Sequence, residues 1–348
     1  MKKLKHTVKD KTVKCALRAL DLFAGVGGST YGTRLAGVNV VAAVDCDAEA
    51  HSTYEDNHPG VHIFRGKCEN LSPREVQRRC GSIDLIIASP ECTSHTCAKG
   101  NARRSEKSRE TAFQVCRFAA HLKPRWIVVE NVVHMRSWKK YPDWIKRLEE
   151  LGYRVRQQVL NAAEFGVPQS RRRLFVLCDR LMDPPKITAW RTLPRKTAAT
   201  ILNSNGAFPF SPLKKKNRAR PTLDRAERAM SALGLKRPFI IVYYGTDGAG
   251  GWQHLNVPLR TITTVDRFAF VRPNGEGHEM RMLQVPELQK AMGFPSKYKL
   301  NRGTRRTKIK LLGNAVCPPV MRAVVRRLTA SIGGERRNRQ RATLGSAD

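Results

Sequence analysis

The segment Asp21–Thr30, DLFAGVGGST, joins an apolar run to a helix-like stretch through a glycine-rich turn. Such glycines let the backbone approach a ligand and aim helix N–H groups at it. Asp45 ends the next apolar run about 20 residues after Gly25, where a carboxylate can bond ribose hydroxyls. A tight turn without a ligand is the alternative for the glycines alone. Together with Asp45, the pattern favours an adenosine-type cofactor.

Cys92 lies in ASPECTSHT, directly after a third apolar run. A thiol in a turn that follows a buried strand, beside a nucleotide-like site, is well placed to act as a nucleophile. Cys97 is a nearby competitor for that role. Taken alone, Cys92 is better explained as a small buried apolar residue, which is common for free cysteine.

A carboxylate and two arginines follow on later apolar runs. Glu130 ends one such run in WIVVENV, and a buried carboxylate is costly unless it is paired or used. Burial would raise its pKa, so that it could hold a proton near neutrality. In PQSRRRLF, Arg171 and Arg173 share one face of a strand, and inward arginines need an anionic or carbonyl partner. The alternatives are an ion pair of Glu130, for example with Arg125, and an edge strand of solvated charge.

Asn314 lies in LLGNAV, before the final amphipathic segment. Its side chain could bond a ligand at the end of the sheet. It could also cap the N-terminus of the last helix, which is the simpler interpretation.

The elements that must position these residues alternate from residue 18 to 179. Apolar runs of strand length are separated by segments with helical periodicity, which predicts a mostly parallel α/β sheet covered on both faces. After Asp179 the pattern weakens, and residues 180–257 are rich in Pro, Lys and Arg. Within them, DRAERAMSALGL predicts a short helix and PFIIVYYGTDGAGG a strand followed by a glycine-rich loop.

These shifts predict five segments along the chain. They are a basic arm at 1–17, a catalytic and cofactor-binding domain at 18–179, a second, smaller domain at 180–257, a return to the first domain with a final helix at 258–330, and a basic disordered tail at 331–348.

The formal net charge of the 348 residues is +35 at pH 7. Like charges repel in a compact chain, so this imbalance indicates a polyanionic partner, most often nucleic acid. No apolar run approaches the ~20 residues that span a bilayer, and the basic N-terminus lacks the apolar stretch of a signal peptide. Nine cysteines without a paired CxxC framework predict a reducing compartment and argue against structural zinc.

In this order, the motifs resemble those of the DNA (cytosine-5) methyltransferase family. DLFAGVGG is similar to its cofactor motif, SPEC to its nucleophile loop, and ENV, QSRRR and GNAV complete the set. RMLQVPELQKAMGFP resembles the segment before the last motif, and the match covers roughly residues 18–179 and 257–329. The sequence departs from the family pattern in three places. Glu91 stands where the family has Pro or no residue, Gly66-Lys67-Cys68 stands where Gly-Asp-Ile is frequent, and Thr93 stands where Gln usually follows the nucleophile.

The resemblance implies a Rossmann-like S-adenosylmethionine-dependent methyltransferase sheet, with residues 180–257 as a target-recognition domain. It implies methyl transfer to C5 of a flipped cytosine in a specific DNA sequence, without a metal and with S-adenosylhomocysteine as product. By resemblance, Cys92 is the nucleophile, Glu130 donates a proton at N3, and Arg173, with Arg171, bonds the cytosine carbonyl. The cofactor-binding residues that it implies are Phe23, Ala24, Gly25, Gly27, Gly28, Asp45, Pro90 and Asn314.

Two alternatives stay open. The same chemistry on tRNA is the first, although a separate domain at 180–257 favours DNA. An inactive relative that only binds DNA is the second, and the intact set of Cys92, Glu130 and Arg173 argues against it. An NAD-dependent oxidoreductase is disfavoured because G-x-G-x-x-G is absent, and adenine or N4-cytosine methylation because an aromatic Pro-Pro motif is absent.

We expect a monomer that acts on double-stranded DNA, without membrane association, in the cytoplasm of a bacterial or phage-infected cell. A restriction endonuclease partner is compatible with this expectation but has no signal in the sequence.

Overall fold

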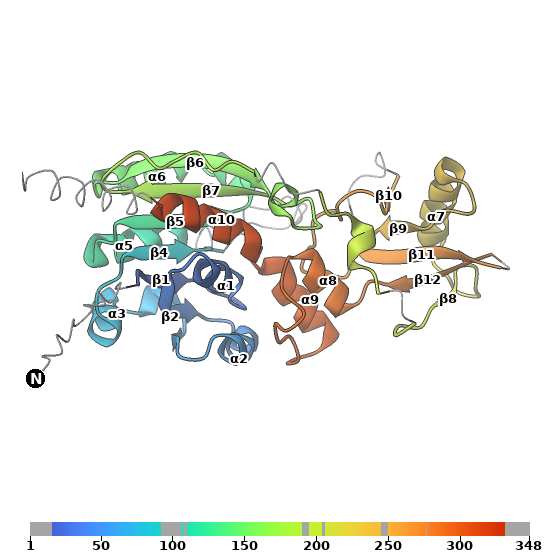
Figure 1. Ribbon diagram of the computed structural model, residues 1–348, viewed down its shortest axis with the longest axis horizontal. Coiled ribbons are helices and arrows are strands. Elements are labelled where there is room, and N and C mark those ends of the chain that lie inside the picture. Colours follow the sequence, from blue (N-terminus) through green and yellow to red (C-terminus); the bar gives the residue numbers. More distant parts are fainter. Residues whose placement is uncertain are drawn as a thin grey trace, which may run out of the picture.

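Two sheets lie at opposite ends of an elongated molecule, a large lobe and a small lobe (Figure 1). The computed structural model describes residues 16–91, 106, 110–189, 195–203, 206–244, 250–275 and 277–330. Most of the predicted basic arm, the loop that carries Cys92 and Cys97, and the predicted tail lie outside the described residues.

The large lobe is built on a seven-stranded sheet in the order β3-β2-β1-β4-β5-β7-β6. Its strands are β1 (Arg18–Leu22), β2 (Asn39–Asp45), β3 (His62–Arg65), β4 (Leu85–Ala88), β5 (Trp126–Asn131), β6 (Arg154–Asn161) and β7 (Arg172–Asp179). The pairings from β3 to β5 are parallel, whereas β7 is antiparallel to both of its neighbours. The prediction of a mostly parallel α/β sheet is confirmed.

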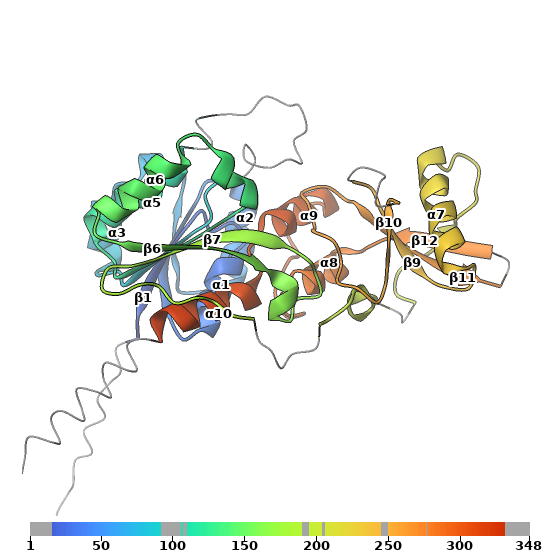
Figure 2. The same cartoon turned by 90° about the horizontal axis from the view of Figure 1, so that it is seen from above.

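Helices cover both faces of this sheet. Every residue of β4 and β5 is buried, as central strands require when both faces are covered. Figure 2 shows α1 and α10 on one face and α3, α5 and α6 on the other. The helices of this lobe are α1 (Gly28–Leu35), α2 (Ala48–Asn57), α3 (Pro73–Cys80), α5 (Ala112–Leu122), α6 (Tyr141–Glu150) and α10 (Pro318–Thr329). Within the described ranges, no helix is long and apolar enough to cross a membrane.

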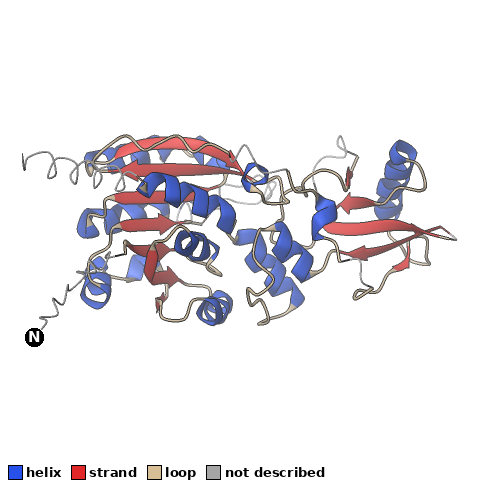
Figure 3. Ribbon diagram, viewed as in Figure 1, coloured by secondary structure: helices blue, strands red, loops and turns tan. Residues whose placement is uncertain are grey.

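The small lobe is an antiparallel sheet in the order β10-β9-β11-β12-β8, with α7 packed against it (Figure 3). Its elements are β8 (Ser211–Pro212), α7 (Arg220–Leu233), β9 (Phe239–Val242), β10 (Trp252–His254), β11 (Phe268–Asn274) and β12 (Gly277–Met282). Ala226 and Ala229 of α7 lie in one apolar core with Phe239, Ile241 and Val271 of the strands. The sequence-predicted helix and strand of this region are both present.

The small lobe extends beyond the boundary predicted at residue 257. β11 and β12 fall in the segment predicted to return to the first domain, yet β11 pairs with β9 and β12 pairs with β11. The buried run Phe268–Val271 has the composition of a strand, but composition does not say which sheet a strand will join. The chain leaves this sheet only after Met282.

Two short helices, α8 (Val285–Ala291) and α9 (Arg305–Asn314), lie between the two sheets (Figure 1). A buried fork joins β12 to α8, because Arg281 donates to both carboxylate oxygens of Glu287 at 2.6 and 2.7 Å. Glu287 also accepts from the backbone N–H of Asn203. Bidentate pairs of this kind are geometrically specific, so the fork fixes how the small lobe meets α8.

Candidate functional site

A cavity of about 510 Å³ opens at the carboxyl ends of the parallel strands, where doubly wound sheets bind ligands. Most of the sequence-predicted site residues line it, namely Phe23, Ala24, Gly25, Asp45, Pro90, Glu130, Arg171, Arg173 and Asn314. Cys92 lies outside the described residues, and Pro90 and Glu91 before it line the cavity. The structure therefore brings together residues from six separate stretches of sequence.

The turn after β1 forms one wall of this cavity. Gly25 has a left-handed φ of +53°, and a Cβ built there would meet no atom within 4 Å, so the space beside it is open. Asp45, at the end of β2, accepts from the backbone N–H of Gly25 and of Asp47, each at 2.7 Å. Burial raises the pKa of Asp45. Each carboxylate oxygen retains a lone pair that a ligand hydroxyl can use.

Gly27 and Gly28, which the resemblance placed among the cofactor-binding residues, do not line the cavity. They serve close packing instead. A Cβ on Gly27 would clash with the ring of His58, and one on Gly28 would clash with the carbonyl oxygen of Val316. Glycine at these positions lets α1 begin tightly between α2 and the segment that precedes α10.

Polar side chains attach the first turn of α1 to β1. Ser29 Oγ and Thr30 Oγ1 both donate to Asp21 Oδ2 at 2.6 Å, and Thr30 Oγ1 lies 2.7 Å from Tyr54 Oη. Burial raises the pKa of Asp21 to about 7, against the opposing effect of these two hydroxyls. These hydrogen bonds fix the start of α1 against β1 and so hold the glycine turn in place.

Glu130 and Arg173 meet across the antiparallel pair of β5 and β7. Arg173 Nε lies 3.3 Å from Glu130 Oε1, and both side chains are largely buried. Burial raises the pKa of Glu130, while the two nearby guanidinium groups act in the opposite direction. The ion pair suggested as an alternative for Glu130 is thus present, but its partner is Arg173, since Arg125 pairs with Asp179 near the start of β5. The result is a carboxyl group able to carry a proton beside a fixed cation.

Arg171 differs from Arg173, although both line the cavity. Its guanidinium donates to the carbonyl oxygens of Ile262, Gly313 and Ala315 at 2.9, 2.8 and 3.2 Å. These carbonyls lie on both sides of Asn314 and on the chain entering β11. The resemblance predicts that Arg171 bonds the cytosine carbonyl together with Arg173. Its guanidinium instead binds backbone carbonyls and holds the chain around Asn314.

We predict that Arg171→Lys lowers the free energy of unfolding by about 2–4 kcal/mol, because one ammonium cannot reproduce the fork that reaches three buried carbonyls. Denaturant unfolding measures this loss. The exposed neighbour provides the matched control, and Arg172→Lys should stay within about 0.5 kcal/mol of wild type. Equal stability of the two variants would show that the carbonyl contacts contribute little.

Asn314 ends α9 and does not open the last helix. α10 begins at Pro318, after Cys317, so the capping alternative for Asn314 is wrong. Its side chain is exposed and lines the cavity. The turn between α9 and α10, held by Arg171, brings it there.

Sequence analysis missed a second group of cavity residues, which includes Asp47, Lys67, Glu69 and Lys310. Lys310 Nζ donates to Asp47 Oδ2 at 2.9 Å, so α9 is tied to the start of α2. Asp47 caps α2 by accepting from the backbone N–H of Glu49, a cap signal that the sequence did contain. Lys67 belongs to the Gly66-Lys67-Cys68 segment that departs from the family pattern, and Glu69 follows that segment.

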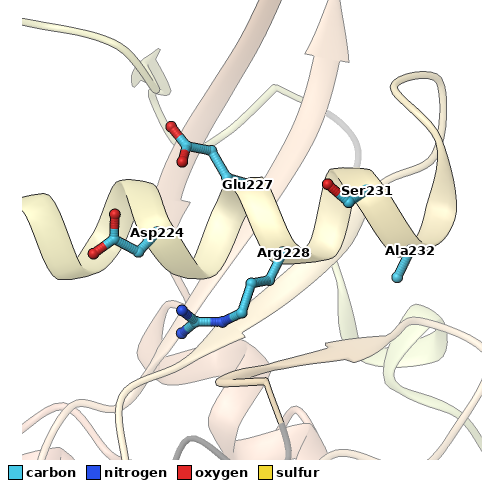
Figure 4. Close-up of a pocket in the computed structure, with 5 residues that line it drawn as sticks. All are labelled: Asp224, Glu227, Arg228, Ser231 and Ala232. Carbon is cyan, nitrogen blue, oxygen red and sulfur yellow. The ribbon is translucent and has the colours of Figure 1, made fainter.

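A second hollow lies along α7 (Figure 4). It is lined by Asp224, Glu227, Arg228, Ser231 and Ala232. Figure 4 shows these side chains spread along one helix and pointing to opposite sides of it. They do not converge on a common point, so the chemistry of the chain is better sought in the cavity at the strand ends, where side chains from several elements meet.

The sequence model of the family described as C-5 cytosine-specific DNA methylase matches residues 17–330. The chain belongs to this family. The fold agrees, because the sheet, the glycine turn and the paired Glu130 and Arg173 all lie within the matched residues. The family's reaction draws its methyl group from S-adenosylmethionine.

Curated relatives are Type II methyltransferases. The chain is 25% identical over 333 residues to M.FnuDI of Fusobacterium nucleatum, which covers 91% of this chain and 95% of that protein. It is 32% identical to M.DdeI of Desulfomicrobium norvegicum over 46% of this chain and 40% of the relative. It is 29% identical to M.AgeI of Thalassovita gelatinovora over 56% of this chain and 47% of that relative. The chain thus spans less than half the length of the latter two relatives.

Solved structures share the fold. A prophage-encoded DNA modification methyltransferase of E. coli superposes with a TM-score of 0.66 at 18% identity, covering 91% of this chain and all of that one. The Dnmt2 methyltransferase of S. pombe superposes with a TM-score of 0.64 at 18% identity, covering 91% of this chain and 99% of that one. The likeness of fold therefore extends over most of this chain and nearly all of each of these proteins.

Proposed function

We propose that this chain is a DNA (cytosine-5-)-methyltransferase, which transfers a methyl group from S-adenosylmethionine to C5 of a cytosine in a specific sequence of double-stranded DNA. The observation that carries the proposal is that one cavity holds both halves of a site. The glycine turn and Asp45 form one half, and the pair of Glu130 and Arg173 forms the other. Pro90 and Glu91, which line this cavity, directly precede Cys92 in the sequence.

C5 of cytosine is a poor nucleophile, so it cannot take a methyl group without activation. The Cys92 thiolate adds to C6 of the cytosine and forms a C–S bond, while the protonated carboxyl of Glu130 supplies a proton at N3. C5 becomes enamine-like and takes the methyl group. The proton on C5 then leaves to a base, the C–S bond breaks so that Cys92 returns as thiolate, and the proton on N3 returns to the Glu130 carboxylate.

The buried environment of the pair suits these roles. Burial raises the pKa of Glu130 and so favours its protonated form, and Arg173 beside it can donate to the cytosine carbonyl and orient the ring. Because a cytosine inside a duplex cannot reach such a cavity, the base must be flipped out of the stack.

S-adenosylmethionine, when bound, supplies an activated methyl group. The cavity fits such a molecule, because its wall is open at Gly25 and Asp45 offers carboxylate oxygens for ribose hydroxyls. Phe23, Ala24 and Pro90 add an apolar lining, and Asn314 adds an amide. These residues would hold the cofactor beside Glu130.

We predict that Asp45→Asn weakens S-adenosylhomocysteine binding by about 10- to 100-fold, because the amide nitrogen cannot accept from a ribose hydroxyl or from the backbone. Isothermal titration calorimetry measures the change. Asp143→Asn, at an exposed position on α6, should leave the affinity unaltered. An Asp45→Asn variant that binds as wild type would remove the ribose role from Asp45.

DNA is favoured over tRNA as the substrate. The curated relatives are Type II methyltransferases, and the small lobe presents a run of exposed lysines, Lys214–Lys216, suited to phosphates. Base recognition belongs to the small lobe in this proposal, because phosphate contacts position a protein whereas base contacts specify the sequence.

Bisulfite sequencing of DNA and tRNA from a bacterial host that expresses the chain tests the proposal. We expect protected cytosines at one recurrent DNA sequence, which are absent from an empty-vector control. Protected cytosines confined to tRNA would support the alternative substrate. Protection of neither nucleic acid, with folded protein present, would contradict the proposed activity.

A further inference from the structure

Two buried side chains lie beneath the glycine turn without lining the cavity. Tyr298, between α8 and α9, donates its hydroxyl hydrogen to the carbonyl oxygen of Val26. His58, which follows α2, places Nε2 3.1 Å from the carbonyl oxygen of Gly27 and 2.9 Å from Tyr298 Oη. The exposed fractions of His58 and Tyr298 are only 1% and 4%. Two consecutive carbonyls of the turn are therefore held by side chains from distant parts of the chain.

The positions of the hydrogens in this pair follow from its chemistry. A carbonyl oxygen can only accept, so the hydrogen between Tyr298 and Val26 is that of the phenol. Burial, assisted by Arg34, lowers the pKa of His58 to about 4, so the ring is neutral near pH 7 and carries one hydrogen. Nε2 faces a carbonyl and a phenol oxygen whose hydrogen is already used, so the imidazole hydrogen lies on Nε2. Among the described residues, the buried Nδ1 has no partner.

The turn and the pair fit each other closely. The His58 ring occupies the space where a Cβ of Gly27 would lie, and Gly27 has a φ of +84° that favours glycine. The rings of Tyr54 and Phe294 fix the two side chains, with centroids 4.7 Å from His58 and 4.6 Å from Tyr298. The two donors therefore have little freedom to move away from the carbonyls.

Holding these carbonyls constrains the cavity wall. A peptide unit is planar, so fixing the carbonyls of Val26 and Gly27 also fixes the N–H groups of Gly27 and Gly28, where α1 begins. Gly25 and Val26 line the cavity, so the held peptides continue directly from its wall. Loss of either donor would let the turn relax at the place where a ligand must fit.

The place of Tyr298 depends on the helix that joins the small lobe. The Gln289 side chain of α8 donates to the carbonyl oxygens of Pro295 and Tyr298 at 2.8 and 2.9 Å. The next residue, Lys299, exchanges two backbone hydrogen bonds with the Asn57 amide at the end of α2, both at 2.8 Å. The loop that carries Tyr298 is therefore fixed on one side by α8 and on the other by α2.

We propose that His58 and Tyr298 are positioning residues of the cofactor site, which shape the glycine turn from beneath by holding the carbonyls of Val26 and Gly27. The inference rests on the proposed function, because it assumes that the cavity takes S-adenosylmethionine. Neither side chain touches the cofactor or the base. Their effect reaches the cofactor only through the turn.

Tyr298→Phe tests the inference because it removes one hydroxyl and keeps the ring. We expect the Kd for S-adenosylhomocysteine, measured by calorimetry on the full chain, to rise about ten-fold. In methylation assays, the KM for S-adenosylmethionine should rise by a larger factor than kcat falls. His58→Phe should also raise this Kd. The double variant should raise the Kd by less than the product of the two single factors, because both residues act on one turn.

Tyr31→Phe is the matched control. The Tyr31 ring packs edge-on against Tyr298 at 5.5 Å, and its hydroxyl makes no hydrogen bond with any described residue. It should leave the Kd within two-fold of wild type. Two results would overturn the inference, a Tyr298→Phe variant that binds as tightly as Tyr31→Phe, and one that loses thermal stability with its affinity unaltered. A wild-type chain that does not bind S-adenosylhomocysteine would refute the proposed function itself, and the inference with it.

Discussion

Cys92→Ser should lower the rate of methyl transfer by at least about 10³-fold, because a hydroxyl is far less ionised and less nucleophilic than a thiol near neutral pH. The loss should appear in single-turnover experiments with saturating DNA, which isolate the chemical steps. DNA affinity should change little, since binding of the duplex does not need the thiolate.

Cys97→Ser is the matched control for this variant. The two cysteines lie in one stretch of sequence, and only Cys92 has the position that the resemblance gives to the nucleophile. We expect the Cys97 variant to retain activity. Full activity of Cys92→Ser together with loss in Cys97→Ser would move the nucleophile to Cys97.

Glu130→Gln should lower the single-turnover rate by about 10²–10⁴-fold, because the amide keeps the shape of the side chain but cannot supply a proton. The pH dependence adds a second readout. Burial raises the pKa of Glu130, so the active protonated form persists to higher pH than for an exposed carboxyl and is lost as pH rises through that pKa. The wild-type rate should therefore fall on the alkaline side, and this fall should be missing in the variant.

Glu150→Gln controls for the loss of a carboxylate far from the cavity, since Glu150 is exposed at the end of α6. Its rate and pH profile should match wild type. If Glu130→Gln retained the wild-type rate, the proton at N3 would have to come from another group.

Local sequence patterns were sufficient for the large lobe and for half of the site. The run RALDLFAGVGG encodes a strand and a turn whose glycines are required by backbone angle and close packing, so Gly25 and Asp45 could be paired from sequence spacing alone. Glu130 and Arg173 end or begin apolar runs, and parallel and antiparallel pairing brings such positions together at one edge.

The remainder depended on contacts that no local pattern encodes. Arg171 is expected from the sequence to share a strand face with Arg173, but it lies just before β7, and its donors meet carbonyls about 90 and 140 residues further along the chain. β11 joins the small lobe by pairing with β9, and β12 joins it by pairing with β11, and the composition of these strands does not specify either pairing. His58 and Tyr298 meet across 240 residues, and single aromatic residues carry no spacing signal.

The central claim is that methyl transfer proceeds through a covalent bond between Cys92 and the target base. Duplex DNA with 5-fluorocytosine at the methylated position tests it, because fluorine at C5 cannot leave as a proton and the C–S bond cannot be released. With S-adenosylmethionine present, wild-type protein should form an adduct that survives denaturing electrophoresis, and Cys92→Ser should form none. An active enzyme that leaves this DNA unmodified, or an equal adduct with Cys92→Ser, would contradict the account.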